Sequence, residues 1–258
     1  PRLMEQLNTG LNRQLTVVSA PAGFGKTTLV TEWLSQLNRP CSWLSLDPGD
    51  NDPFRFILYL TAACQEVDGA MGQSVRDLLD LPQSPSLDTL VALLINDITA
   101  AAPPFTLILD DYDTIHTESI HATVEFLIAH QPSQLHLVLI TRHDPPLPLA
   151  RLRVRDQVTE VREEDLRFTF EETEGFFHRL FGLHLGQKVV AALEERTEGW
   201  VAGLQLAALS LQGQSEQQIT EFVQRFSGSH RHLIDYLTEE VLAQQDEDIR
   251  RFLCETSI

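Results

Sequence analysis

The sequence predicts an α/β protein, with a five-stranded parallel sheet flanked by helices and followed by a region built only of helices. Three observations support this fold class. Short β-branched apolar runs alternate with longer segments whose apolar residues recur at helical spacing. A loop with two glycines joins the first strand pattern to the first helix pattern, and from Glu171 onward no strand pattern remains. Alternating strands and helices favour parallel pairing, because each connection crosses back over the sheet.

The loop after the first predicted strand has the sequence APAGFGKTT and runs from Ala20 to Thr28. Its glycines allow the backbone to curl so that successive N–H groups point at one anion, and the start of the next helix adds further N–H groups. In such a loop the lysine reaches the β- and γ-phosphates and the next hydroxyl binds Mg²⁺. The usual pattern opens with glycine, where this chain has alanine. We therefore expect an ATP or ADP site with Mg²⁺, in which Thr27 is also a metal ligand, formed by Ala22, Gly23, Phe24, Gly25, Lys26, Thr27 and Thr28.

The other elements of the predicted sheet follow in chain order. The expected strands are 14–19, 40–46, 105–109, 135–140 and 158–161. The expected helices are 29–37, a helix capped by Asn51 or Asp52, 87–102 and 118–130. The segment 68–86, with its glycines and prolines, is expected to be a surface connection. Together these elements predict the sheet of a phosphate-loop (P-loop) NTPase.

Charged side chains follow two of the predicted strands. Asp110 and Asp111 end the third strand, and Arg142 follows the fourth. Because the carboxyl ends of parallel strands meet at the edge where ligands bind, we expect these side chains to face the nucleotide. Asp110 would hold Mg²⁺ through water, Asp111 would position or deprotonate the attacking water, and Arg142 would sense the γ-phosphate. The alternatives are that the two aspartates only start a loop and that the arginine is an ordinary surface residue.

The last third of the chain is predicted to be helical. Apolar residues at helical spacing mark short helices at 176–181, 189–193, 200–211, 216–226, 230–243 and 249–253. The predicted domains are a nucleotide-binding domain at 1–165, a helical lid domain at 166–228 and the first helices of a further domain at 229–258.

Charge and composition limit the possible partners. The chain has 19 Lys and Arg against 37 Asp and Glu, a formal net charge of -18, so we expect no direct contact with nucleic acid. No apolar stretch approaches the length of a membrane span, so no membrane association is expected. The three cysteines lie far apart without a CxxC pair, which fits a reducing cytoplasm and argues against a zinc site. The first residue is Pro1, and we expect the chain to be part of a longer protein.

Several segments in order resemble one protein family. Together they are similar to the STAND class of signal-transduction ATPases and, within it, to the large LuxR-type transcriptional regulators. The resemblance covers nearly the whole chain. Its segments are SAPAGFGKTTL from Ser19, LDPGDN from Leu46, LDDY from Leu109, HQP from His130, LRVRDQ from Leu152, LRFT from Leu166, GW at Gly199, LQL from Leu204, DYL from Asp235 and EVL from Glu240.

The resemblance implies a switch that is closed with ADP and self-associates with ATP when a small-molecule inducer arrives. Slow ATP hydrolysis would reset it, so only a weak ATPase activity is expected. It places Arg2 near the adenine side of the site. In the family a Gly-x-Pro motif contacts the adenine, whereas this chain has Val201 at the proline position. It also implies that a winged-helix domain begins within 229–258, and that inducer and DNA are bound by domains outside this chain.

Two other functions are compatible with the phosphate loop. A small-molecule kinase would need an acceptor pocket and usually a basic lid, whereas the helical region here is acidic. A protein-interaction module with an inactive nucleotide site would not bind ATP at all. Incubation with labelled ATP distinguishes this last possibility from a nucleotide switch.

Overall fold

The computed structural model describes residues 2–79, 85–101 and 103–225, which form two compact units. Of the described residues, the first unit comprises 2–20 together with those between Lys26 and Arg162, and the second comprises Pro21–Gly25 together with 163–225. The predicted winged-helix start at 229–258 lies outside the described residues, so it and the domain limits given above remain predictions.

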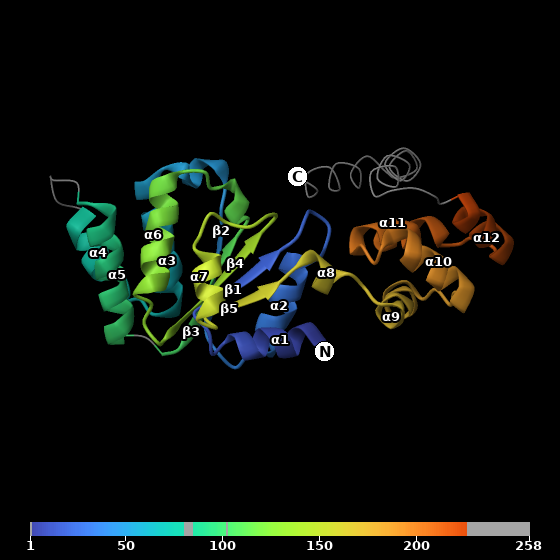
Figure 1. The fold of residues 1–258 in the computed structure, drawn as a ribbon, viewed down its shortest axis with the longest axis horizontal. Helices are drawn as coiled ribbons and strands as arrows, with labels where there is room; N and C mark the ends of the chain where they lie inside the picture. Colours follow the sequence, from blue (N-terminus) through green and yellow to red (C-terminus); the bar gives the residue numbers. More distant parts are fainter. Residues whose placement is uncertain (1, 80–84, 102, 226–258) are drawn as a thin grey trace. The chain divides into compact units, whose positions relative to one another are not determined.

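The first unit contains a five-stranded parallel sheet with the order β2-β3-β4-β1-β5 (Figure 1). Every pairing between neighbouring strands is parallel, which confirms the predicted fold class. The interior strands β1, β3 and β4 are buried along their whole length, in keeping with their mostly apolar sequences, whereas edge strand β2 is partly exposed. The strands are β1 Leu15–Ser19, β2 Cys41–Ser45, β3 Phe105–Asp110, β4 Leu135–Thr141 and β5 Val158–Val161.

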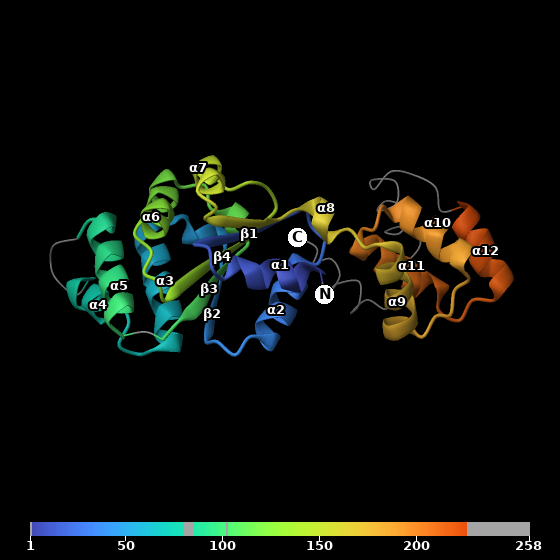
Figure 2. The same cartoon turned by 60° about the horizontal axis from the view of Figure 1, so that its bottom comes forward.

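Helices cover both faces of this sheet. Leucine and valine side chains of one face form a continuous core with α3 (Pro53–Val67), α5 (Leu87–Ala101) and α6 (Glu118–Ala129). The other face packs against α1 (Arg2–Gly10) and α2 (Lys26–Gln36), which Figure 2 shows on the side of the sheet away from α3 and α6. A short helix, α7 (Leu149–Val154), precedes β5. None of the helices in the described ranges is long and apolar enough to cross a membrane.

The expectation that 68–86 is only a surface connection is wrong. A short helix, α4 (Gln73–Leu79), lies within it and packs on α5. Met71 and Val75 are fully buried there, and Asp97 of α5 accepts hydrogen bonds from the backbone and hydroxyl of Ser74. The helix is too short for its apolar residues to show helical periodicity, and its position depends on contacts with α5 that are distant in sequence.

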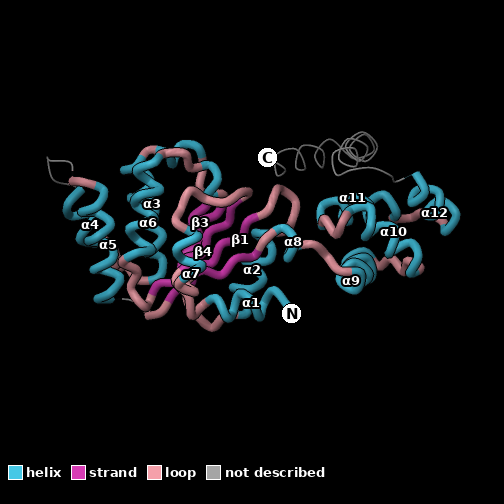
Figure 3. The backbone as a smooth tube through the Cα atoms, viewed as in Figure 1, coloured by secondary structure: helices cyan, strands magenta, loops and turns pink. Residues whose placement is uncertain are grey.

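The second unit is helical, as predicted, and has no strand among its described residues (Figure 3). Thr169 and Glu172 form a capping box at the start of α9, and Gly182 ends that helix in the left-handed conformation. The helices are α8 Glu163–Leu166, α9 Phe170–Phe181, α10 Gln187–Thr197, α11 Val201–Leu211 and α12 Glu216–Arg225.

A buried histidine joins β4 to the residues around the start of β1. His136 Nδ1 lies 3.0 Å from the carbonyl oxygen of Arg13, and Nε2 lies 3.0 Å from the hydroxyl of Thr16. A neutral imidazole satisfies both partners when Nδ1–H donates and Nε2 accepts. Burial lowers the pKa of His136 to about 4, against the partly opposing hydrogen bond to Arg13. The histidine is therefore neutral in the folded protein near pH 7.

We predict that replacing His136 with Gln weakens the acid sensitivity of the fold. Because the folded pKa lies below the unfolded one, the unfolded chain binds the extra proton between about pH 6.5 and 4. The contribution of His136 to stability is present above that window and is lost as the pH falls through it. Urea unfolding near pH 5 should therefore show about 2 kcal/mol less stabilisation from this group than near pH 7. The exposed His116→Gln is the matched control, and an equally steep pH dependence in His136→Gln would contradict the assignment.

Candidate functional site

The loop between β1 and α2 has the backbone conformation expected of a phosphate cradle. Gly23 and Gly25 have φ angles of +78° and +74°, a region that residues with a Cβ rarely adopt. Lys26 is the first residue of α2, so the N–H groups of that helix terminus belong to the same loop. Ala20, which replaces the usual glycine, is buried, and its amide donates to the carbonyl of Thr141 at 3.3 Å.

Lys26, in the first unit, lies near both negative and positive side chains. Its ammonium group donates to the carbonyl oxygen of Ala20 at 2.7 Å. Burial lowers the pKa of Lys26, and the negative charge of Asp113 is the largest influence opposing this shift. Arg142 lowers the Lys26 pKa further, whereas Asp111 and Asp110 raise it. The lysine is therefore partly desolvated and surrounded by charges of both signs.

Thr27 and Asp110, the two expected metal ligands, lie together. The hydroxyl of Thr27 donates to Oδ2 of Asp110 at 3.3 Å. Asp110 is buried, and burial, followed by the neighbouring charge of Asp111, raises its pKa. A nearby cation would offset the cost of the buried carboxylate.

This pair fits a magnesium ion. Mg²⁺ prefers oxygen ligands, and proteins usually supply one or two of them while water and phosphate oxygens complete the octahedron. A hydroxyl and a carboxylate at the end of a phosphate loop are such a donor set. Across residues 2–79, 85–101 and 103–225 no cluster of three or more His, Cys, Asp or Glu side chains is arranged to hold a metal ion by itself.

Asp111 has an unusual backbone. Its φ of 55° places it in the left-handed region, and its amide donates to Oδ1 of Asp110 at 2.9 Å. The residue is exposed, in contrast to its buried neighbour. The turn therefore separates the two carboxylates, with Asp110 directed into the protein and Asp111 accessible to solvent.

Arg142 is bound to a carboxylate that the sequence analysis did not single out. Its backbone amide donates to Oδ1 of Asp113 at 3.0 Å, and its Nε lies 3.5 Å from Oδ2 of the same residue. Asp113 therefore joins the loop after β3 to the loop after β4. The position of Asp113, three residues after the end of β3, could have marked it as a further acidic residue of this loop. Its contact with Arg142 follows only from the parallel pairing of β3 with β4.

Pro21–Gly25 pack within the second unit, against the start of α11. The indole Nε1 of Trp200 donates to the carbonyl of Ala22 at 3.3 Å, and the amide of Ala202 donates to the carbonyl of Gly23 at 3.1 Å. The Phe24 ring is buried and lies 6.5 Å from the Trp200 ring, centroid to centroid. The side chain of Phe24 is thus part of this packing, and its expected contribution to binding is through its backbone. The sequence does not show that Trp200 and Ala202 contact this loop.

Two more of the expected nucleotide-binding residues lie at the starts of helices. Thr28 is exposed in the first turn of α2. Arg2 is exposed at the first residue of α1, and its expected place near the adenine stays a prediction.

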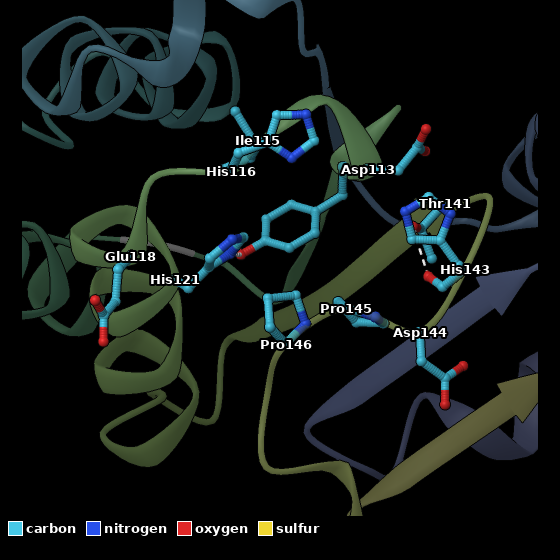
Figure 4. Close-up of a pocket in the computed structure, with 11 residues that line it drawn as sticks. Asp113, Ile115, His116, Glu118, His121, Thr141, His143, Asp144, Pro145 and Pro146 are labelled. Carbon is cyan, nitrogen blue, oxygen red and sulfur yellow. Dashed lines mark hydrogen bonds between the residues drawn. The ribbon is translucent and has the colours of Figure 1, made fainter.

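A cavity of about 340 Å³ lies beside the loop that follows β3, and Figure 4 shows the side chains around it. The Tyr112 hydroxyl lies 2.9 Å from Nδ1 of His121, and the Thr141 hydroxyl donates to the carbonyl of His143 at 2.8 Å. Carboxylates and imidazoles both line it, and one of the carboxylates is Asp113, which binds Arg142. The lining residues are Tyr112, Asp113, Ile115, His116, Glu118, His121, Thr141, His143, Asp144, Pro145 and Pro146.

Comparison with known families agrees with this geometry. The sequence matches the family described as AAA ATPase domain over residues 2–140, which is more than half of the chain. The chain belongs to this family. Its members are ATPases, so the loop with Lys26 and the strand end with Asp110 lie in an ATPase domain.

Curated relatives of this AAA ATPase domain are transcriptional regulators. The chain is 38% identical over 258 residues to the HTH-type transcriptional regulator MalT of Yersinia enterocolitica, and 38% identical over 258 residues to MalT of Serratia proteamaculans. Both matches cover 100% of this chain and 28% of the relative. The chain thus spans just over a quarter of the length of these proteins.

Solved structures share the fold at much lower identity. A STAND protein with a tetratricopeptide repeat sensor from Pyrococcus horikoshii matches with a TM-score of 0.61 at 14% identity, covering 100% of this chain and 38% of that one. Cdc6p from Pyrobaculum aerophilum matches with a TM-score of 0.52 at 14% identity, covering 96% of this chain and 68% of that one. These likenesses concern the fold of the AAA ATPase domain.

We predict that Gly23→Ala damages the phosphate loop beyond the cost of its backbone conformation. A Cβ at Gly23 would lie 2.8 Å from the Ala202 Cβ and 2.9 Å from the Trp200 Nε1. Gly213 has a similar φ of +74° with nothing within 4 Å, so Gly213→Ala isolates the backbone cost of roughly 1–2 kcal/mol. Calorimetric titration with ADP should show at least about a tenfold loss of affinity in Gly23→Ala only. Equal affinities in the two variants would contradict this reading of the loop.

Proposed function

We propose that this AAA ATPase domain is the ATP- and ADP-binding switch of a transcription activator, which self-associates with ATP and is reset by slow hydrolysis. The observation that supports nucleotide binding most directly is the contact of Thr27 with Asp110 at the end of a glycine loop, Oγ1 to Oδ2 at 3.3 Å. A hydroxyl and a buried carboxylate in this arrangement suit a magnesium–phosphate complex. Thr27 and Asp110 are 83 residues apart in the sequence, so the fold brings them together.

The regulatory part of the proposal rests on similarity along the whole chain. The match to MalT proteins extends through the helical unit as well as the sheet. In a protein of this kind a small-molecule inducer and DNA would be bound by other domains. The net charge of -18 supports the absence of direct nucleic-acid contact by this part.

Each residue near the loop has a proposed task. The backbone of Ala22–Gly25 and the ammonium of Lys26 hold the phosphates, with Thr28 at the start of the helix and Arg2 on the adenine side. Mg²⁺, held by Thr27 and through water by Asp110, would neutralise phosphate charge. Asp111, exposed beside Asp110, orients the attacking water or takes its proton. Arg142, paired with Asp113, responds to the presence of the γ-phosphate.

We predict that Lys26→Ala abolishes tight nucleotide binding. The chain has only one other lysine, Lys188, which is exposed on α10, so Lys188→Ala is a control matched in residue type and charge. Removal of a cation that contacts two phosphates should lower ADP and ATP affinity by at least about a hundredfold. Calorimetry with Mg²⁺ present measures this, and equal affinities in wild type and Lys26→Ala would refute the site.

We predict that Asp111→Asn separates binding from hydrolysis. The substitution keeps the shape of the side chain but removes its ability to accept a proton, so ATP affinity should stay within about twofold while kcat falls by at least about a hundredfold. Release of labelled phosphate in single-turnover reactions is the measurement. Unchanged turnover would remove Asp111 from this role, and loss of binding would indicate a role in holding the nucleotide.

Other functions have less support. A small-molecule kinase is not favoured by the relatives, which are transcriptional regulators. A module with an inactive nucleotide site would show no binding of ATP by the wild-type protein in the calorimetry of the Lys26 experiment.

A further inference from the structure

The segment between β2 and α3 forms a turn held by several side-chain hydrogen bonds. Residues 48–51 make a single 3₁₀ turn whose capping box joins Asp47 and Asp50. The Asp50 side chain is buried and accepts from the Asp47 amide at 2.8 Å and from Nε of Arg55 at 2.9 Å. Asp52 caps α3 by accepting from the amide of Arg55. Asp52 is therefore the cap of α3, and Asn51, the other residue that the sequence offered for this position, makes different contacts.

The Asn51 side chain binds the backbone of the loop that follows β3. Its Nδ2 donates to the carbonyl of Thr114 at 2.8 Å. Its Oδ1 accepts from the amides of His116 at 2.7 Å and Thr117 at 3.1 Å. One amide group therefore satisfies a carbonyl and two N–H groups more than sixty residues away in sequence.

This loop is the one that contains the acidic residues of the site. It begins at Asp110. The carbonyl of Asp110 accepts from the amide of Leu46 at 3.0 Å, and Leu46 lies just before the turn at residues 48–51. It includes Asp111 in its left-handed conformation and Asp113, which binds Arg142. On its other side the loop lines the cavity of Figure 4, where the Tyr112 hydroxyl meets His121. Asn51 thus supplies the anchor on the side of β2.

We propose that Asn51 is a positioning residue for hydrolysis, which fixes residues 111–117 so that Asp111 faces the reacting water. This inference rests on the proposed ATPase function of the site. The side-chain amide of Asn51 suits these contacts because it donates one hydrogen bond and accepts others at the same time. Aspartate keeps the acceptor but loses the donor to Thr114, and alanine loses both. A left-handed residue such as Asp111 also needs its surroundings to maintain it.

Hydrogen exchange tests, without nucleotide, whether the Asn51 side chain holds the loop that follows β3. In Asn51→Ala the amides of His116 and Thr117 lose their acceptor, and their exchange should become at least about tenfold faster. Asn51→Asp should leave them protected because Oδ1 remains. Exchange in β1 and β4 should not change in either variant, and Asn96→Ala, an exposed position on α5, should resemble wild type throughout. Unchanged exchange at these two amides in Asn51→Ala would show that the Asn51 side chain does not hold this loop.

Steady-state hydrolysis then separates positioning from simple structural support. The kcat for ATP should fall at least about tenfold in Asn51→Ala and less in Asn51→Asp, while KM and ADP affinity stay within about twofold of wild type. An unchanged kcat despite faster exchange would overturn the catalytic part of the proposal. If wild type itself fails to bind ATP, the proposed function fails, and the exchange comparison still decides whether Asn51 holds the loop.

Discussion

The parallel pairing of β3, β4 and β1 is the constraint on which the site depends. It brings the ends of these strands to one edge of the sheet, and β4 lies between the other two. Arg142, which follows β4, is therefore placed between the strand that leads to Lys26 and the strand that ends in Asp110. A different strand order would leave the same residues in the chain without bringing their charges together.

The charges at this edge balance one another only in part. Burial lowers the pKa of Lys26 and raises that of Asp110, so the folded protein disfavours the charged form of each group taken alone. The two shifts arise from the same loss of solvent and are partly offset by mutual attraction. A ligand that supplies both phosphate and a cation would offset the cost of charging each group.

Much of this arrangement follows from the sequence, because short, mostly apolar strands and a glycine loop are local signals. All five strands and the direction of their pairing were predictable, and so was the meeting of Thr27 with Asp110. The nucleotide-binding roles of these two residues and of Lys26 remain predictions. Other features were not predictable, and three of them illustrate why. The helix α4 is too short to show periodicity, and Asp113 has a role only because β3 and β4 are neighbours. The sequence offered Asn51 and Asp52 as alternative caps of α3, and the loop that Asn51 contacts instead lies more than sixty residues away in sequence.

The indole of Trp200 gives this domain an internal optical probe. Its Nε1 donates to a carbonyl of the phosphate loop, and only 8% of the residue is exposed. Indole emission depends on the polarity and hydrogen bonding around the ring, so a rearrangement of Pro21–Gly25 would alter its wavelength and intensity. With only three tryptophans in the chain, the conformation of the loop is open to spectroscopy without any added label.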